Sequence, residues 1–237
     1  MQLELFPLAN KVALVTNGFG PVGEEICRRL AGAGANVWLH GQVEEGCELS
    51  DTMAAEWTAL GVHLSPVRGT AADRQTIAQL VATILEQCGK IDLLVNNCQA
   101  GQRRSFHQLT PADWLTTMQL NLDRPFLFCQ QVLPAMLGAG GGTIVHVSST
   151  AALTGQISPD FAASQSAVQS LTKGLWHEFH GKGIQVIGLA PEAKEAGAEQ
   201  SGQLAKAIGE MVLLLGTGYG VYLNGEILTV HGGIPNG

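Results

Sequence analysis

The fold is decided by V-A-L-V-T-N-G-F-G-P-V-G at residues 12–23, a stretch in which a short apolar run leads into a glycine-rich turn. A short apolar run bounded by a turn is typical of a strand buried inside a parallel sheet. From here to the end of the chain, short apolar runs alternate with longer helical patterns, which predicts repeated β-α-β units. Seven runs are predicted to be strands, and they begin near Val12, Val37, Val62, Ile91, Thr143, Ile184 and Glu226.

Length and composition agree with a single domain. The chain has 237 residues, of which 46% are hydrophobic and 14% are charged, and it contains 30 glycines. A chain of this size already buries most of its unfolded surface in one doubly wound domain. The sequence therefore predicts one α/β domain of the Rossmann type over residues 1–237, with a seven-stranded, mostly parallel sheet and helices on both faces.

Charge, hydropathy and cysteine spacing exclude several classes of function. The net charge of −7 is spread without basic runs, so the chain lacks the cationic surface that nucleic acids and anionic membranes require. The sequence has no long apolar run and no signal-peptide pattern, which predicts a cytoplasmic protein. The five cysteines stand at unequal spacings without a Cys-x-x-Cys, so we expect reduced thiols and no metal site.

Two helices have recognisable starts. Thr110, followed by Pro111 and Asp113, predicts an N-cap, a first-turn proline and a partial capping box. Residues 158–160, Ser-Pro-Asp, predict the same arrangement for a second helix. That helix carries an apolar stripe at i, i+3/i+4 and i+7 steps, and the stripe ends near Gly181.

Several segments, in order along the chain, resemble the short-chain dehydrogenase/reductase family. They are V-A-L-V-T at 12–16, I-D-L-L-V-N-N at 91–97, the helix that contains Asn121, I-V-H-V-S-S at 144–149, and the helix at 159–180. N-G-E-I-L-T-V-H-G-G at 224–233 resembles the last strand of the family. The resemblance covers essentially the whole chain and implies the scaffold of an NAD(P)-dependent oxidoreductase.

The first turn departs from the family's pattern. Family members bind a nicotinamide dinucleotide over T-G-x-x-x-G-x-G, whereas Asn17 and Pro21 replace two of those glycines here and Gly23 remains. Proline fixes φ and removes an N–H from a loop whose amides face phosphate. Gly18, Gly20 and Gly23 nevertheless spell G-x-G-x-x-G, so dinucleotide binding through these glycines and Asn96 stays an alternative.

Three further positions weaken the resemblance to a cofactor site. Residues 39–42 at the end of the second strand offer neither a carboxylate for a ribose nor an arginine for a 2′-phosphate. The family's N-N-A-G motif reads Asn-Asn-Cys-Gln at residues 96–99, so Gln99 stands where the family has a glycine. The family's Pro-Gly after the sixth strand is Pro191-Glu192 in this chain. Together these changes imply that this chain holds no cofactor and that NAD(P) belongs to a partner subunit.

Two of the family's four catalytic positions carry the expected residue in this chain. Family enzymes use Asn, Ser, Tyr and Lys; Asn121 and Ser149 match, but Phe161 and Gln165 stand at the positions of Tyr and Lys. The reaction needs a phenol, whose reference pKa of about 10 is lowered by a nearby ammonium, to exchange a proton with the substrate oxygen. A benzyl ring and a neutral amide cannot do this, so no catalytic residue is expected in this chain.

Other groups have weaker claims to the proton. His146 on the fifth strand and Ser164 on the helix of Phe161 are alternative donors, although the position of His146 on a strand favours a core residue. Asn121 and Ser149 are alternatively structural, with Asn121 and Pro125 kinking a helix and Ser149 capping a strand end. His107, His177 and His180 are expected to be solvated or to serve packing.

The remaining segments predict a partner. The connection between Pro191 and a last helix expected near Gln203 is short, where the family places a substrate lid. The resemblance implies oligomer interfaces on the helices near 111–137 and 159–180 and on the last helix and strand. It further implies the inactive subunit of a heteromeric hydroxyacyl-CoA dehydrogenase, such as that of anaerobic toluene degradation. An active reductase with an atypical proton donor and a dinucleotide-sensing regulatory module remain alternatives.

Overall fold

One sheet forms the centre of the molecule. The computed structural model describes residues 7–43, 51–68, 74–101, 104–192 and 198–231. The strands are β1 (Val12–Thr16), β2 (Asn36–Val43), β3 (Val62–Arg68), β4 (Leu93–Asn97), β5 (Gly142–Val147), β6 (Ile184–Pro191) and β7 (Ile227–Val230). They lie in the order β3-β2-β1-β4-β5-β6-β7, and every neighbouring pair is parallel. The predicted Rossmann-type sheet is therefore confirmed.

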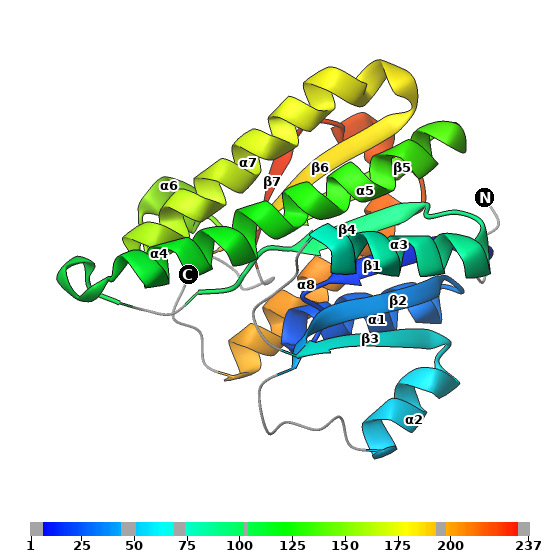
Figure 1. Cartoon of the computed structure of the whole chain (residues 1–237), viewed down its shortest axis with the longest axis horizontal. Coiled ribbons are helices and arrows are strands. Elements are labelled where there is room, and N and C mark those ends of the chain that lie inside the picture. Colours follow the sequence, from blue (N-terminus) through cyan, green and yellow to red (C-terminus); the bar gives the residue numbers. More distant parts are fainter. Residues whose placement is uncertain (1–6, 44–50, 69–73, 102–103, 193–197, 232–237) are drawn as a thin grey trace.

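Helices cover both faces of this sheet (Figure 1). The helices are α1 (Pro21–Gly32), α2 (Asp51–Ala59), α3 (Arg74–Cys88), α4 (Pro111–Met118), α5 (Arg124–Gly138), α6 (Ala151–Thr154), α7 (Pro159–Phe179) and α8 (Ala198–Gly216). α1 and α8 pack on one face, and α3, α5 and α7 pack on the other. Because both faces are covered, β1 is buried along its whole length, with Ala13 and Val15 in one core and Val12 and Leu14 in the other.

Short irregular helices complete the chain. η1 (Phe106–Gln108), η3 (His180–Lys182) and η4 (Tyr219–Leu223) are 3-10 turns. η2 (Gln119–Asp123) is a π-helical turn between α4 and α5. The distortion predicted at Asn121 is this turn, and such turns bend helices. α8 begins at Ala198 and not near Gln203 as expected, so six residues separate it from the end of β6.

The two predicted helix starts differ in outcome. At α4 the capping box is complete, because the N–H of Asp113 donates to Thr110 Oγ1 (3.2 Å) and the N–H of Thr110 donates to Asp113 Oδ2 (3.1 Å). At α7 the prediction was wrong in one respect: Ser158 occupies the N-cap, but its hydroxyl makes no capping hydrogen bond. The Ser158 side chain is buried next to the Asp160 carboxyl, which draws the hydroxyl away from the backbone N–H groups.

No helix in the part of the chain that the structure describes is both long and apolar enough to cross a membrane.

Candidate functional site

The predicted catalytic positions meet at the carboxyl ends of the central strands, around residues 98–101 that follow β4. Such an edge is where ligands bind in open α/β sheets. Gln165 contacts Cys98, Asn121 contacts Ala100, and Phe161 packs on Gly101. Ser149 lies after the neighbouring strand β5. The structure therefore brings Asn121, Phe161 and Gln165 together around one loop, with Ser149 at the end of the adjacent strand.

Phe161 packs against bare backbone. The side chain is only 4% exposed, and a Cβ added at Gly101 would lie 2.5 Å from Phe161 Cδ2. Separations under about 3 Å between such atoms are not tolerated, so the ring and the Gly101 backbone are in direct contact. The tyrosine position is thus a packing position in this chain, with no polar atom on the ring.

Gln165 is fully buried, and its amide is engaged by the same loop. Its Nε2 donates to the main-chain oxygen of Cys98 at 2.6 Å, while its Oε1 has no hydrogen-bond partner among the described residues. The lysine position therefore carries a neutral donor that is already used by the protein backbone. It is not available to hold a ribose or to lower a neighbouring pKa.

The side chains of Asn121 and Ser149 both form hydrogen bonds with main-chain groups. Asn121 Nδ2 donates to Ala100 O (2.7 Å), and the N–H of Ala100 donates to Asn121 Oδ1 (2.9 Å), so the amide pins the loop after β4 in both directions. Ser149 Oγ accepts a hydrogen bond from the N–H of Ala151 (3.2 Å) in the turn that joins β5 to α6. Both side chains are thus engaged by main-chain groups of this chain.

The two alternative proton donors are also engaged. His146 is fully buried, with Nδ1 2.9 Å from Thr172 Oγ1 and Nε2 3.5 Å from Cys129 Sγ. Burial lowers its pKa to about 4, which keeps the ring neutral. Ser164 Oγ donates to Phe161 O (2.7 Å) and accepts from Asn121 Nδ2 (2.9 Å). Neither side chain is left with a group free to serve a substrate.

Three glutamine amides tie the edge of the sheet together, and sequence reasoning recognised only two of these positions. Gln99 Nε2 donates to Ser148 O at 2.8 Å, so it spans from the end of β4 to the end of β5. Gln169 Nε2 donates to Ser149 O at 3.1 Å, one helical turn after Gln165. The signal that was missed is a second glutamine at i+4 on the buried stripe of α7.

The turn after β1 is held by hydrogen bonds and close contacts within this chain. The N–H of Gly18 donates to His40 O (3.0 Å), and a Cβ at Gly23 would come within 2.5 Å of Gly18 Cα. Asn17 adopts a positive φ of 49°, which asparagine tolerates, and Asn17 and Asn97 each donate a side-chain N–H to the other's main-chain oxygen. Packing inside the turn therefore leaves no room for a side chain at Gly23, and an added Cβ at Gly18 would lie 2.7 Å from the Leu39 side chain.

Phe19 covers the end of β2. A Cβ at Gly41 would lie 2.9 Å from Phe19 Cδ2, so the ring packs on the bare face of Gly41. In dinucleotide folds the adenosine ribose binds at this strand end. The side chain that approaches here is an aromatic ring, and the neighbouring His40 is buried against Ser65 and Phe128.

Asn96 is fully buried, whereas the Glu192 side chain is partly exposed. Asn96, predicted as a cofactor residue, is fully buried: Oδ1 accepts from Thr16 Oγ1 (3.2 Å) and Nδ2 donates to Cys129 Sγ (3.5 Å). Its side chain is thereby committed to the interior of the sheet. Glu192 lies at the edge as expected from the sequence, with Oε2 3.1 Å from His231 Nδ1, and joins the ends of β6 and β7.

Within the described ranges, no three His, Cys, Asp or Glu side chains are grouped so as to hold a metal ion. Cys27, Cys88, Cys98 and Cys129 are free thiols, and Cys47 lies outside those ranges. Burial raises the pKa of Cys129 to about 12, so its thiol stays protonated.

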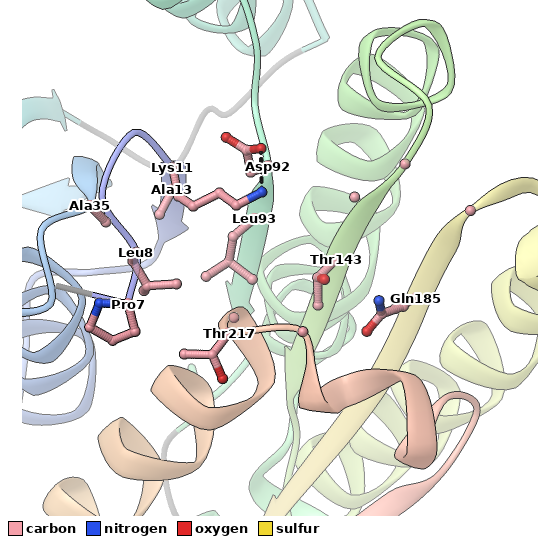
Figure 2. Close-up of a pocket in the computed structure, with 15 residues that line it drawn as sticks. Pro7, Leu8, Lys11, Ala13, Ala35, Asp92, Leu93, Thr143, Gln185 and Thr217 are labelled. Atoms are coloured by element: carbon pink, nitrogen blue, oxygen red, sulfur yellow. Dashed lines mark hydrogen bonds and ion pairs between the residues drawn. The ribbon is translucent and has the colours of Figure 1, made fainter. Parts of the chain in front are cut away.

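A separate cavity of about 290 Å³ opens at the opposite edge of the sheet, at the amino ends of β1, β4, β5 and β6 (Figure 2). Lys11 reaches Asp92 there at 3.1 Å, and Asp92 also accepts from the N–H of Val12 (2.9 Å). Its carboxylate is satisfied by these neighbours, so the cavity has a structural ion pair and lies far from the predicted catalytic positions.

Comparison with known proteins shows how far the likeness extends. A family model described as "short chain dehydrogenase" matches residues 11–204. Gluconate 5-dehydrogenase of Gluconobacter oxydans is 29% identical over 98% of this chain and 97% of that protein. Human dehydrogenase/reductase SDR family member 4 is 32% identical over 97% of this chain and 89% of that protein. The crystal structure of a short chain dehydrogenase from Burkholderia cenocepacia in complex with NADP matches with a TM-score of 0.81 at 27% identity, over 96% and 98% of the two chains.

Proposed function

Because the chain belongs to the short-chain dehydrogenase/reductase family, we propose that it is a non-catalytic subunit of an NAD(P)-dependent alcohol or hydroxyacyl-thioester dehydrogenase. In this proposal it pairs with a catalytically competent sister chain and stabilises it. The observation that carries the proposal is the pair Phe161 and Gln165, which stand buried and engaged at the positions of the catalytic tyrosine and lysine.

The proton step is the part of the chemistry that this pair cannot perform. Positioned acid–base catalysis accelerates reactions by roughly 10²–10⁴-fold, and the loss of electrostatic support lowers the rate further. Phe161 has no ionisable atom, and Gln165 donates its amide to Cys98 O. His146 and Ser164 have committed their polar atoms to Thr172, Cys129, Asn121 and Phe161, so neither replaces the tyrosine.

The residues present do not fit a dinucleotide held in the family's manner. Phe19 packs on Gly41 where an adenosine ribose would bind, and Pro21 lacks an N–H at the first position of α1. Gln99 reaches across the edge to Ser148 O, and a carboxylate, Glu192, lies at the end of β6. These features support NAD(P) binding by the partner subunit rather than by this chain.

Exposed apolar side chains support a partner on the predicted helices. Leu115 on α4 is 59% exposed and Phe126 on α5 is 46% exposed. The neighbouring α7 presents the small exposed residues Ser166, Ser170 and Gly174 on its outer face. A face of large apolar side chains beside a shallow helix surface is suited to packing against a second pair of helices. Leu214, Tyr219, Val221 and Tyr222 form a second exposed apolar group on α8 and η4.

The test is purification of the chain alone and together with a sister short-chain dehydrogenase from the same genome. We expect no NAD(P)-dependent turnover by the isolated chain and a fixed stoichiometric complex with the sister chain. A partner that binds only the folded form raises apparent stability by mass action, so the complex should also unfold at a higher temperature than either chain alone.

Each alternative gives a distinct result in the same experiment. Turnover by the isolated chain at an enzymatic rate would establish an active reductase with an atypical proton donor and overturn the proposal. Micromolar binding of NAD(H) or NADP(H) in calorimetry without turnover would favour a dinucleotide-sensing module. Absence of any complex with sister chains would remove the pairing role.

A further inference from the structure

The ring of Phe19 stands between two parts of the carboxyl edge of the sheet. On one side it lines a cavity of about 390 Å³, whose wall continues through Ala100 and Gly101 to α4 and the start of α7. On the other side it packs on Gly41 at the end of β2, where an added Cβ would lie 2.9 Å from Phe19 Cδ2. No residue of β2 is among the described lining residues of the cavity. Within the described lining, the cavity therefore ends at this ring.

The backbone on both sides of Phe19 is held in place. Before it, the N–H of Gly18 donates to His40 O at 3.0 Å and ties the turn to the end of β2. After it, the N–H of Glu24 donates to Gly20 O at 2.9 Å and ties the turn to the first helical turn of α1. The Phe19 side chain is partly buried and packs against the core that lies under α1 and α8. These contacts fix the ring over the end of β2.

The surface under the ring suits a flat ligand. Gly41 has no side chain, and the next atoms that a Cβ there would meet belong to the main chain, namely Gly18 N at 3.0 Å and Phe19 N at 3.3 Å. In dinucleotide folds this strand end receives the adenosine portion of the cofactor. A purine is a flat aromatic group, as is the phenyl ring that lies here. Apolar space that is left when a large side chain is removed can bind an aromatic molecule in its place.

We propose that the Phe19 ring takes the place of the adenosine portion, so that this one side chain excludes an adenine nucleoside from the end of β2. The inference rests on the proposed function, in which this chain holds no dinucleotide, and it assigns the exclusion of the adenosine end to a single residue. Pro21 acts on a different part of a dinucleotide, because its missing N–H concerns the phosphates. A nucleoside without phosphate is therefore blocked by Phe19 and is unaffected by Pro21.

The experiment removes the ring and measures binding of adenosine, a probe that carries the base and the ribose but no phosphate. The full chain and its Phe19→Ala variant are titrated with adenosine, and binding is followed by saturation-transfer NMR. We expect Phe19→Ala to bind adenosine at least about tenfold more tightly than the wild type. Ribose alone should show no such gain, because the purine is the group that replaces the phenyl ring. Phe106→Ala is the matched control, since Phe106 is a phenylalanine of η1 that is 75% exposed and lies outside the described lining of the cavity.

Equal adenosine affinity of the wild type and Phe19→Ala would overturn the inference, and so would an equal gain in Phe106→Ala. If Phe19→Ala does not fold, Phe19→Leu decides instead, because leucine keeps an apolar contact with the core but has no flat ring to lie on Gly41. Folded Phe19→Leu should also gain adenosine affinity, and no gain would contradict the inference.

Titration of the wild type with NAD(H) and NADP(H) separates this inference from the proposed function. Binding of either dinucleotide by the wild type would contradict the proposed cofactor-free subunit. If the wild type binds neither dinucleotide and Phe19→Ala gains no adenosine affinity, the proposed function stands and the role given to Phe19 is wrong.

Discussion

Gln165 Nε2 lies 2.6 Å from the main-chain oxygen of Cys98, so the residue at the lysine position of the family's catalytic pair holds the loop that follows β4. Gln99 and Gln169 make comparable bonds to the loop that follows β5. Amides that bridge adjacent strand ends stabilise the edge in one conformation. At this edge of the sheet, the chain's own side chains therefore join the loops that follow β4 and β5.

Gln165→Leu tests this structural role. Leucine has a similar volume but leaves Cys98 O without its donor in the interior, which should lower the free energy of unfolding by about 1 kcal/mol or more. Urea denaturation followed by circular dichroism measures the change. Gln79→Leu, at an exposed position of α3, should change stability by less than about 0.5 kcal/mol. Equal stability of the two variants would mean that the Gln165 bond is not stabilising.

Restoring the catalytic pair should not restore activity. Phe161→Tyr with Gln165→Lys returns the phenol and the ammonium, but Phe19 still covers Gly41 and Pro21 still lacks an N–H. We expect turnover of the double variant with NAD(H) or NADP(H) and a panel of carbonyl substrates to stay at background, and calorimetry to detect no dinucleotide binding. Activity from these two substitutions alone would show that the first turn is competent.

The glycines of the first turn should behave as packing residues. Gly23→Ala brings a Cβ within 2.5 Å of Gly18 Cα, a backbone atom that cannot move aside, so we expect a loss of about 1–3 kcal/mol in unfolding free energy. Gly32→Ala in the same helix meets nothing within 4 Å and should raise stability by about 0.5 kcal/mol. Thermal unfolding of both variants without any nucleotide provides the comparison. If Gly23→Ala does not change stability in the absence of ligand, packing is not the reason why Gly23 matches the family's glycine pattern.

The sequence predicted the scaffold well because its signals are local. Apolar runs bounded by turns located all seven strands, and Thr110 with Asp113 predicted a cap that the structure completes. The hydrogen bonds of the candidate site join residues that are far apart in the chain. Gln165 and Cys98 are 67 positions apart, and Gln99 and Ser148 are 49 positions apart. Phe19 reads as an ordinary turn residue until the fold places it over Gly41. Side-chain partners across parallel strands have no periodic signature, so they required the structure.

Acidification should destabilise the fold through two buried histidines. Burial lowers the pKa of both His40 and His146 to about 4, with the charge of Arg124 as a further cause for His40. Both rings take up protons near pH 6.5 in the unfolded chain but only near pH 4 in the folded chain. The free energy of unfolding therefore has its full value above pH 6.5 and decreases as the pH falls from 6.5 to 4. Each histidine contributes a slope of roughly 1.4 kcal/mol per pH unit, or about 2 kcal/mol between pH 6.5 and 5.

Urea midpoints at pH 7.5, 6 and 5 measure this slope. His146→Asn should flatten it by about half, at a lower overall stability, whereas His107→Gln at an exposed position of η1 should leave it unchanged. A stability that does not vary over this range would mean that the two rings are protonated in the folded chain.

The last prediction concerns the proposed pairing surface on α4 and α5. Leu115 and Phe126 are among the large apolar side chains exposed on α4 and α5. Burying apolar area stabilises an interface by about 25 cal/mol per Å², and a carboxylate placed in such a contact is desolvated without a partner. Leu115→Glu with Phe126→Glu should therefore weaken the complex with the sister chain at least a hundredfold, while the isolated chain keeps its unfolding midpoint because both positions face solvent.

Leu60→Glu is the matched control, because Leu60 is also an exposed leucine but lies just after α2, away from α4, α5 and α7. Sedimentation velocity of each variant mixed with the sister chain measures complex formation directly. If the double variant still assembles, the contact runs instead through α8 and η4, where Val221→Glu then becomes the disruptive change. If neither surface responds while the complex persists, the two chains associate in a way that the helices of this family do not explain.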